Sequence, residues 1–497
     1  MQQLPSRNVE LTAEHLPRVD SRIAVPTYDR TALRRGIVHI GVGGFHRAHQ
    51  AVYLDDLCAT GLTDWSIVGA GVLPGDRAMA DALLPQGGLY TLIVRGSEAT
   101  QVRVIGSLVD YVLAAPDIRP LVGALCDPST RIVSLTITEG GYPVDERSGA
   151  FLRPTDRQLP PAFEAIVRAL EIRREQGLGG FTVMSCDNIM HNGVTAKAAT
   201  LGVAASIDAE LASWIDRNVT FPNTMVDRIT PATAAADTAY LETEYGLLDR
   251  WPVVAEPFTQ WVIEDAFAAG RPPWEEVGAL FTGNVEPYEI LKLRLLNAGH
   301  SCLAYLAALV GHVYVHDVIA DELFLTFLTR FLDDEASPAL PPVPGIDVTQ
   351  YKAQLVERFA NPGVRDQVAR LCLDGTSKFP KFLIPTIEAQ LGGGRPVELS
   401  ALALAGWCQY LTGKDEQGRT IDLAYDPNLA AAKEHAHASI AEPHLFLGFI
   451  DVFGSIVASS DRFESAFVRA LTSIRSAGVH STLKRSLNEV SDAQPGA

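Results

Sequence analysis

GIVHIGVGGFHRAHQ, residues 36–50, is the most informative stretch of this chain. Its first five residues form an apolar run that predicts a short buried strand, and a glycine-rich loop follows directly. Residues 45–61, FHRAHQAVYLDDLCATG, have helical spacing and end at a glycine. A strand, a glycine loop and a helix in this order are typical of the first βα unit of a dinucleotide-binding domain.

The loop departs from the usual G-x-G-x-x-G pattern at its third position. Gly41 and Gly43 stand where the first glycine permits a tight turn and the second lets the backbone approach a pyrophosphate. His46 replaces the third glycine, which normally lets the helix pack closely on the strand. An ordinary βα turn would contain the same two glycines, so the loop alone leaves both interpretations open. His46 and His49 are spaced as helical neighbours, but without a third ligand we expect them to be structural and not metal-bound.

The rest of the chain changes character about halfway along. Further buried strands, with helix-like stretches between them, are predicted at residues 65–72, 131–138, 180–188 and 252–258. This alternation predicts an α/β fold with a mostly parallel sheet covered by helices. After GRPPW, residues 270–274, long helical patterns dominate. We therefore expect a Rossmann-like dinucleotide-binding domain at residues 1–285 and a mainly α-helical substrate domain at residues 286–497.

Composition and charge narrow the possible partners. The 497 residues carry a formal net charge of −18, which disfavours binding to nucleic acid. No apolar run reaches the roughly 18 to 20 residues that span a bilayer, and the N-terminal residues do not resemble an export signal. The six cysteines lie far apart without metal-binding spacing, which suits reduced thiols. We expect a cytoplasmic protein with a small-molecule substrate, no metal, and no nucleic-acid or membrane partner.

Asp76 is the first acidic residue after the second predicted strand, and it indicates which nicotinamide cofactor would bind. In dinucleotide-binding folds such an acid hydrogen-bonds the ribose 2′-hydroxyl and would repel a 2′-phosphate. Asp76 therefore favours NAD, while Arg77 beside it could attract the phosphate of NADP. Asp76 comes later than the usual spacing, which a long first helix would explain.

YEILKLRLLNAGH, residues 288–300, opens the helical part with polar residues that do not suit a solvated surface. Measured from Lys292 at about 100° per residue, the others fall on one side: Glu289 at about 60°, His300 at about 80° and Asn297 at about 140°. Leucines share this arc. The mixture predicts that the polar set lines a cavity.

The chemistry open to Lys292 follows from such surroundings. A lysine in a partly apolar cleft is disfavoured in its charged form, so its pKa can fall from about 10.4 towards a value useful for proton abstraction. A fall of about three pKa units corresponds to about 4 kcal/mol, which burial can supply. Such an amine could take the hydroxyl proton of an alcohol while a hydride leaves for a nicotinamide, with neutral amides holding the developing alkoxide. A buried salt bridge between Lys292 and Glu289 is the alternative, and it would make the pair structural.

Seven stretches, taken in chain order, resemble the mannitol dehydrogenase family of polyol-specific long-chain dehydrogenases. They are GVGGFHRAHQ (41–50), VSLTITEGGY (133–142), FTVMSCDNIMHNG (181–193), MVDRITPAT (225–233), VVAEPFTQWVIED (253–265), K-x-x-x-x-N-x-x-H (292–300) and DGTSKFPKFLIPTI (374–387). The resemblance covers nearly the whole chain. It implies an NAD-dependent, metal-independent enzyme that interconverts D-mannitol and D-fructose, in a family whose members are often monomers. The family tolerates FHRAHQ where other Rossmann proteins have a third glycine, so the loop is expected to bind the cofactor.

The resemblance also implies roles for the polar residues. Lys292 matches the family's general base, and Asn188 and Asn297 match the two amides that hold the reacting oxygen. His300 would orient the lysine and the substrate, and Glu289 would lie on the proton route from the lysine to water.

Three further residues match positions that bind the distal hydroxyls of the polyol: Asp227, Arg370 and Lys378. Each has a simpler alternative. Asp227 could form an ion pair with Arg228, and Arg370 could cap its helix.

The expected cofactor residues are Gly41, Gly43, Gly44, Phe45, Asp76, Arg77, Thr138 and Glu139. Thr138 and Glu139 would border the nicotinamide, although either could simply terminate a strand. In close relatives another acid precedes the residue that matches Asp76, and here that position is Gly75. NAD remains the expected cofactor, but this departure makes some use of NADP possible.

Alternatives within the family are a reductase of hexuronates such as fructuronate or mannonate, a sugar-phosphate dehydrogenase, and a dehydrogenase of sorbitol or arabinitol. An anionic substrate would need a cationic cluster, which Arg370 and Lys378 could supply. A non-catalytic NAD-binding sensor is the alternative from another class. The retention of Lys292 and both amides argues against it.

Overall fold

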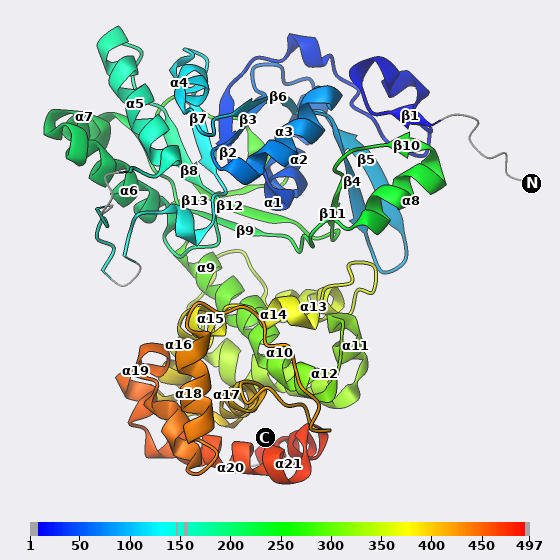
Figure 1. Ribbon diagram of the computed structural model, residues 1–497, viewed down its shortest axis with the longest axis vertical. Helices are drawn as coiled ribbons and strands as arrows, with labels where there is room; N and C mark the ends of the chain where they lie inside the picture. The colour runs from blue at the N-terminus through cyan, green and yellow to red at the C-terminus, as the bar shows by residue number, and fades with distance from the viewer. Residues whose placement is uncertain (1–7, 146–147, 154–157, 493–497) are drawn as a thin grey trace, which may run out of the picture. The chain divides into compact units, whose positions relative to one another are not determined.

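The computed structural model describes residues 8–145, 148–153 and 158–492, with side chains described up to residue 488. The chain forms two compact units, Met1–Glu286 and Pro287–Ala497. The first unit is built around parallel strands, and the second is helical (Figure 1).

The centre of the first unit is a five-stranded sheet in which every neighbouring pair of strands is parallel. In spatial order the strands are β6 (Leu108–Leu113), β3 (Ile67–Gly71), β2 (Ile37–Ile40), β7 (Ile132–Leu135) and β8 (Thr182–Ser185). The chain order reverses between β2 and β7, so the loops leaving these strands diverge at the carboxyl edge of the sheet. This is the strand order of a Rossmann fold, and such a reversal is where these folds bind ligands.

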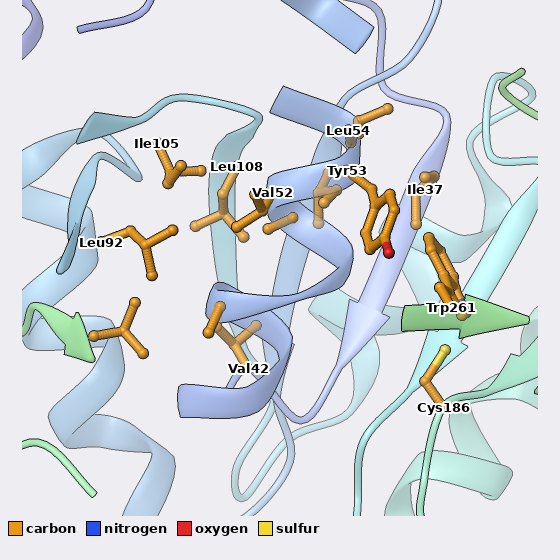
Figure 2. Close-up of a cluster of buried hydrophobic side chains, with 14 of the residues drawn as sticks. Ile37, Val42, Val52, Tyr53, Leu54, Leu92, Ile105, Leu108, Cys186 and Trp261 are labelled. Atoms are coloured by element: carbon orange, nitrogen blue, oxygen red, sulfur yellow. The ribbon is translucent and has the colours of Figure 1, made fainter. Parts of the chain in front are cut away.

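Alternate residues of each strand supply two separate hydrophobic cores. In β2, Ile37 joins the first core, while Val38 and Ile40 join the second. Helices α2 (Gln50–Ala59) and α3 (Arg77–Leu83) contribute to the first core, in which Ile37 lies near side chains of α2 (Figure 2). The second core is completed by α4 (Arg119–Cys126), α5 (Pro161–Gln176), α6 (Asn192–Ile207) and α7 (Ala209–Asn218). A parallel sheet covered on both faces needs continuous apolar strands, which explains why these runs were recognisable in the sequence.

Smaller sheets complete the first unit among the described residues. One has the order β11 (Val253–Ala255), β4 (Tyr90–Arg95) and β5 (Thr100–Ile105), and another has β13 (Leu280–Thr282), β12 (Gln260–Glu264) and β9 (Thr224–Asp227). Strands β1 (Val9–Glu10) and β10 (Leu247–Leu248) form a two-stranded pair. The strand predicted at 252–258 is therefore shorter, and it pairs with β4 instead of joining the main sheet. The hairpin of β4 and β5 was not predicted, because β5 carries exposed residues at its start and gives no continuous apolar run.

The helix predicted at 45–61 is in fact two helices, α1 (Gly44–Ala48) and α2. His49 breaks it, with φ −127° and ψ −89°. Among the residues described in this unit, the remaining α-helix is α8 (Ala235–Tyr245). Short 3-10 segments lie at Ala13–Arg18, Arg30–Ala32, Pro74–Asp76, Leu84–Gln86, Glu139–Gly141 and Trp274–Val277.

The second unit begins with one continuous helical stretch. It consists of α9 (Glu286–Lys292), a π-helical turn η7 (Leu293–Asn297) and α10 (Ala298–Val310). The other α-helices are α11 (Val315–Ala320), α12 (Glu322–Arg330), α13 (Val348–Phe359), α14 (Val368–Leu371), α15 (Gly375–Phe382), α16 (Ile384–Gly392), α17 (Glu398–Tyr410), α18 (Leu429–Ala438), α19 (Ile450–Ala458), α20 (Asp461–Ala477) and α21 (Val479–Asp492). A second π-helical segment lies at Phe331–Ala336, and 3-10 segments lie at Ser337–Ala339 and Pro443–Gly448. The predicted fold class, a Rossmann-like domain followed by a helical domain, is confirmed.

Within the described residues, Glu286–Val310 is the one helix long and apolar enough to cross a membrane, with a mean hydropathy of 1.3. The sequence analysis had found no such segment. In the structure 72% of its apolar window is buried, as in the core helix of a folded domain.

Candidate active site

The predicted cofactor residues lie in the loops at the carboxyl edge of the parallel sheet. The loop and helix start after β2 carry Gly41, Gly43, Gly44 and Phe45, the turn and helix start after β3 carry Asp76 and Arg77, and the loop after β7 carries Thr138 and Glu139. The loop after β8 carries Asn188, which was predicted as a catalytic residue. The carboxyl ends of parallel strands meet at one edge, so the fold brings these loops to the same side of the first unit.

Gly41 is required by the backbone of its turn. It adopts a φ of +93°, which favours glycine. A Cβ atom at this position would lie 2.3 Å from the carbonyl oxygen of Thr136, in the loop after β7. The loops after β2 and β7 therefore meet closely, and no residue with a side chain fits at position 41.

Gly43 has no such internal requirement. Its φ is −112°, and a Cβ there would meet only the carbonyl oxygen of Gly41, at 3.8 Å. A Cβ at Gly44 would make ordinary contacts with side chains of Thr230 and Val253, at 3.7 and 3.8 Å. A side chain at position 43 would thus fill open space beside the backbone, the space that a dinucleotide pyrophosphate uses in this type of loop. The loop fits NAD in this respect.

His46, at the position of the third glycine, packs flat against His39 of β2. The ring centroids are 3.5 Å apart with an 8° angle between the planes, and both side chains are fully buried. Two stacked rings therefore separate α1 from β2 where a glycine would permit direct contact. Burial lowers the pKa of His39 to about 3 and that of His46 well below its ordinary value, so both rings are neutral near pH 7.

Hydrogen bonds connect this stack to the glycine loop. The Thr136 hydroxyl donates to the carbonyl oxygen of Gly41 at 2.8 Å, so it accepts from Nε2 of His39, also at 2.8 Å. The Ser134 hydroxyl then donates to Nδ1 of His39 at 2.8 Å. The roles of His39 and Thr136 were not predicted from the sequence. The available signal was a histidine in the middle of an apolar strand, because a buried polar side chain needs hydrogen-bond partners.

Asp76 is held by its own turn at the end of β3. One carboxylate oxygen accepts from the backbone N–H of Leu73 at 2.9 Å. A Cβ at Gly71 would lie 2.4 Å from Cβ of Asp76, so the glycine allows the acid to sit against the strand. Arg77 is exposed, and a Cβ at Gly75 would meet nothing within 4 Å. An anchored carboxylate at this edge suits recognition of a ribose hydroxyl.

The remaining predicted residues of the first unit differ in exposure. Thr138, Glu139 and Asn188 are exposed, whereas Asp227 is 4% exposed at the end of β9. Its neighbour Arg228 donates to the backbone carbonyl oxygens of Glu256, at 3.0 Å, and Ala48, at 2.5 Å. Phe45 stacks on His49, with 4.9 Å between the ring centroids.

In the second unit, one helical stretch carries Glu289, Lys292, Asn297 and His300. Lys292 and His300 are 8% exposed and Glu289 is 5% exposed. These three side chains are therefore buried polar groups, as the sequence pattern predicted, and Asn297 is half-buried. Burial of this kind disfavours the charged form of an amine.

The π-helical turn corrects the angular arrangement that the sequence predicted. A π-turn contains one extra residue, so every later residue is set back by about 100° relative to a regular α-helix. Measured from Lys292, Asn297 moves from about 140° to about 40°, and His300 moves from about 80° to about −20°. Glu289 precedes the turn and stays at about 60°. The four residues thus occupy a narrower arc than an α-helix would give them.

Two buried polar atoms on this helix have no hydrogen-bond partner among the described residues, Oδ1 of Asn297 and Nε2 of His300. The His300 ring stacks on Phe359 at 3.9 Å between centroids. Burial lowers the pKa of His300 to about 3, against a raising effect of Asp366, so the imidazole is neutral near pH 7. An unpaired buried polar atom costs about 1–3 kcal/mol. Two of them within one helical turn of each other indicate a place for a polar ligand.

Arg370 and Lys378 are electrostatically close to His300, whose pKa both of them lower. Arg370 forms two hydrogen bonds to the carboxylate of Asp366, at 2.7 and 2.6 Å, and this ion pair uses one edge of its guanidinium. Nζ of Lys378 donates to the carbonyl oxygen of Leu371 at 3.2 Å, and burial lowers the pKa of Lys378. The second unit therefore brings both predicted substrate residues near the His300 ring.

All six cysteines are free thiols. Within the part of the chain that the structure describes, no group of three or more His, Cys, Asp or Glu side chains is placed to hold a metal ion.

Both units match models of known protein families. Residues 35–276 match the family model of the mannitol dehydrogenase Rossmann domain, and residues 284–475 match that of the mannitol dehydrogenase C-terminal domain. The chain belongs to the mannitol dehydrogenase family. The family predicted from the seven motifs is thus confirmed, and the protein is a dehydrogenase, as expected.

Individual members of the mannitol dehydrogenase family are similar over nearly the full chain. The mannitol 2-dehydrogenase of Cereibacter sphaeroides is 44% identical over 473 residues, which cover 93% of this chain and 98% of that protein. The mannitol 2-dehydrogenase of Emericella nidulans is 41% identical over 480 residues, covering 93% and 95%. Among solved structures, the ternary complex of Pseudomonas fluorescens mannitol 2-dehydrogenase with NAD and D-mannitol has a TM-score of 0.88 and 44% identity, covering 97% of this chain and all of that one. A D-sorbitol dehydrogenase in substrate-free form has a TM-score of 0.87 and 37% identity, covering 95% and 100%.

Asp187 was not predicted as a functional residue, although the adjacent Asn188 was. Asp187 is 8% exposed and accepts hydrogen bonds from the loop after β7. The signal that could have found it is an acidic residue within an otherwise apolar predicted strand, next to Asn188 in the stretch FTVMSCDNIMHNG. A buried carboxylate needs several donors, and so it organises the backbone around it.

Proposed function

We propose that this protein is a mannitol 2-dehydrogenase that interconverts D-mannitol and D-fructose, with NAD as its coenzyme and Lys292 as its general base. The loop from Gly41 to Phe45 holds the pyrophosphate, and Asp76 binds the ribose hydroxyls. Thr138 and Glu139 border the nicotinamide. A lysine, in place of a metal ion, activates the alcohol.

The chemical roles follow from the residue types. NAD⁺, when bound, supplies the acceptor for the hydride that leaves the carbinol carbon. Lys292, in its uncharged amine form, takes the proton of the hydroxyl on that carbon and becomes an ammonium ion. The amides of Asn188 and Asn297 donate hydrogen bonds to the oxygen as negative charge develops on it. Glu289 passes the proton from Lys292 towards water, and His300 orients the substrate as a neutral imidazole.

The observation that carries this proposal is the set of buried polar groups on one helix. Lys292 is 8% exposed, and one atom each of Asn297 and His300 is buried without a partner in the described chain. A polyol supplies hydroxyl groups that both donate and accept, so it can satisfy such atoms without bringing a charge. The π-turn places Lys292, Asn297 and His300 within a narrower arc around the helix axis.

The state of Arg370 favours a neutral substrate over a hexuronate or a sugar phosphate. Its guanidinium already forms two hydrogen bonds to Asp366, whose side chain is 7% exposed. A substrate carboxylate bound to Arg370 would share the guanidinium with the buried carboxylate of Asp366, and the repulsion between the two negative charges disfavours it. Arg370 and Lys378 therefore bind hydroxyl groups of the polyol with their remaining donors.

Sorbitol and D-arabinitol are proposed as secondary substrates. They share part of the hydroxyl stereochemistry of mannitol, and the likeness to a D-sorbitol dehydrogenase over 95% of the chain supports the first of them.

Initial rates test the proposal directly. The purified protein is assayed with mannitol, sorbitol, arabinitol and mannonate against NAD⁺ and NADP⁺, following absorbance at the NADH band. Mannitol with NAD⁺ should give the highest kcat/KM. A preference for mannonate would instead support the hexuronate reductase, and NADH binding without turnover of any polyol would support a non-catalytic sensor.

A further inference from the structure

Thr138 has an unusual backbone conformation, with φ 64° and ψ 165°. This region is essentially restricted to glycine, and a β-branched residue there is strained. Such a conformation persists only where the surrounding structure holds it, and strained residues of this kind cluster at functional sites. Thr138 follows β7, at the carboxyl edge where the cofactor residues lie.

The side chain of Asp187 holds this conformation. Oδ1 of Asp187 accepts from the backbone N–H of Thr138 at 2.8 Å, and Oδ2 accepts from the backbone N–H of Ile137 at 3.1 Å. Oδ2 also accepts from the hydroxyl of Tyr142, at 2.6 Å. We call these four residues, Asp187, Ile137, Thr138 and Tyr142, the Asp187 clamp.

The negative charge of the Asp187 carboxylate is stabilised by these hydrogen-bond donors and not by a cation. Asp187 is 8% exposed, and no ion pair involves it among the described residues. Burial raises the pKa of Asp187, while the hydrogen bonds from Tyr142, Thr138 and Ile137 act in the opposite direction. The carboxylate therefore depends on the conformation of the loop after β7, and the loop depends on the carboxylate.

The clamp is also anchored on its other side, in β8 and α6. The Ser185 hydroxyl is 2.7 Å from the Tyr142 hydroxyl, and it accepts from the backbone N–H of Asp187 at 3.3 Å. The amide of Asn192 donates to the carbonyl oxygen of Asp187 at 3.1 Å. With its side chain and its backbone both held, Asp187 determines where the backbone continues into Asn188.

We propose that Asp187 is a positioning residue of the dehydrogenase reaction. It joins the loops after β7 and β8, holding Thr138 in its strained conformation and setting the direction of Asn188. This inference rests on the proposed function, in which Thr138 borders the nicotinamide and Asn188 holds the reacting oxygen. In this role Asp187 acts through the positions of Thr138 and Asn188.

Strain gives a test that separates positioning from simple stabilisation. Glycine adopts the conformation of Thr138 without a penalty, so Thr138→Gly should remove most of the need for the carboxylate. Asp187→Asn should lower kcat about 100-fold in the wild-type background, because a displacement of about 1 Å near the reacting atoms has an effect of that size. In the Thr138→Gly background the same substitution should lower kcat by less than about tenfold.

Two further variants calibrate this experiment. Tyr142→Phe removes one donor and leaves both backbone hydrogen bonds, so a decrease in kcat of only about threefold is expected. Asp208→Asn is the matched control, because Asp208 also accepts from two backbone N–H groups, those of Glu210 and Leu211, at the start of α7. It should change thermal stability and leave kcat, KM and NADH affinity unchanged.

The readouts are kcat and KM for mannitol, the dissociation constant of NADH by fluorescence, and amide hydrogen exchange of the cofactor-free protein. The proposal predicts a selective loss of kcat that Thr138→Gly relieves, and strong exchange protection of the Thr138 N–H in the wild-type protein. An equal loss in both backgrounds would overturn it. Unprotected Thr138 N–H exchange in the folded wild-type protein would also overturn it, whether or not the variants fold. Failure of wild-type turnover would count against the proposed function alone, because exchange and NADH binding do not depend on the substrate.

Discussion

The two units prepare for the reaction by different means. In the first unit the key geometry belongs to the backbone, with Gly41 at φ +93° and Thr138 at φ 64°, both in loops at the carboxyl edge of the sheet. In the second unit it belongs to side chains on one helix, where a π-turn lies between Lys292 and Asn297. Substitutions in the glycine loop of the first unit should therefore act through cofactor binding and folding, and those of the buried polar residues on this helix through the chemical step.

This difference matters because it predicts separable defects. A backbone held in a tight turn leaves no space for an added side-chain atom, so substitutions there also lower the stability of the folded protein. A buried amine is tolerated at the expense of stability and is retained for its chemistry, so its removal need not harm the fold.

Replacement of Lys292, the proposed general base, should show the strongest effect. Lys292→Ala should reduce kcat at least about 1,000-fold, the order expected for a lost general base, while the NADH dissociation constant changes less than about twofold. Lys378→Ala is the matched control on a half-buried lysine of the same unit, and it should raise KM for mannitol more than it lowers kcat. Steady-state kinetics and NADH fluorescence check both variants. Loss of NADH affinity with kcat intact would refute the assignment of Lys292.

The glycine loop offers a matched pair in the first unit. Gly43→Ala should preserve the fold and weaken NADH binding about 100-fold, because its Cβ would enter only the open space of the loop. Gly41→Ala should also lower the free energy of unfolding by about 1–3 kcal/mol or more, since its Cβ would lie 2.3 Å from the Thr136 carbonyl oxygen. Calorimetry and NADH titration distinguish the two. If Gly43→Ala bound NADH normally, the pyrophosphate would not lie at this loop.

Acid should destabilise both units through buried histidines. The pKa values of His39 and His300 are lowered to about 3 by burial, below the ordinary value of about 6.5 that the unfolded chain retains. The unfolded state therefore binds the proton first, so each histidine contributes stability that is present above about pH 6.5 and lost as the pH falls. The slope is about 1.4 kcal/mol per pH unit for each histidine, or about tenfold in the folding equilibrium.

The substitutions His39→Phe and His300→Phe should each remove one such slope from urea unfolding curves measured between pH 6.5 and pH 4.5. Their functional effects should differ. His39→Phe should weaken NADH binding through Thr136 and Gly41, whereas His300→Phe should lower turnover with NADH affinity unchanged. Identical functional defects in the two variants would contradict the division between the units.

A smaller effect is expected at Gly75. A Cβ there would meet nothing within 4 Å, so Gly75→Glu should fold normally and place a second carboxylate beside Asp76. Repulsion of the 2′-phosphate should then increase the preference for NAD⁺ over NADP⁺ about three- to tenfold. The ratio of kcat/KM values for the two coenzymes measures this. A decrease in the ratio would mean that Asp76 does not face the ribose.

In the first unit, the strands were predicted more accurately from the sequence than the contacts between side chains. Continuous apolar runs identified β2, β3, β7 and β8, because both faces of the sheet are covered. The roles of His39 and Asp187 were not predictable in the same way, because each depends on partners about 40 to 100 residues away along the chain.

In the second unit, the burial of the polar residues was predicted from the sequence. Their angular positions around the helix axis were predicted wrongly. The pattern of Lys292, Asn297 and His300 at regular helical spacing gives a broad arc. The π-turn narrows it, but such a turn has no reliable signature in a single sequence. The pairing of Arg370 with Asp366 is a local i, i+4 contact and could have been predicted.

Chemical rescue of Lys292→Ala measures the central claim most directly. Small primary amines of graded pKa are added to the variant with saturating mannitol and NAD⁺, and the rate of NADH formation is followed. If the amine of Lys292 removes the hydroxyl proton, the rate should rise with amine concentration and with amine pKa across the series. Residual turnover that does not change with any added amine and keeps the pH profile of the wild-type protein would contradict the assignment of Lys292 as the base.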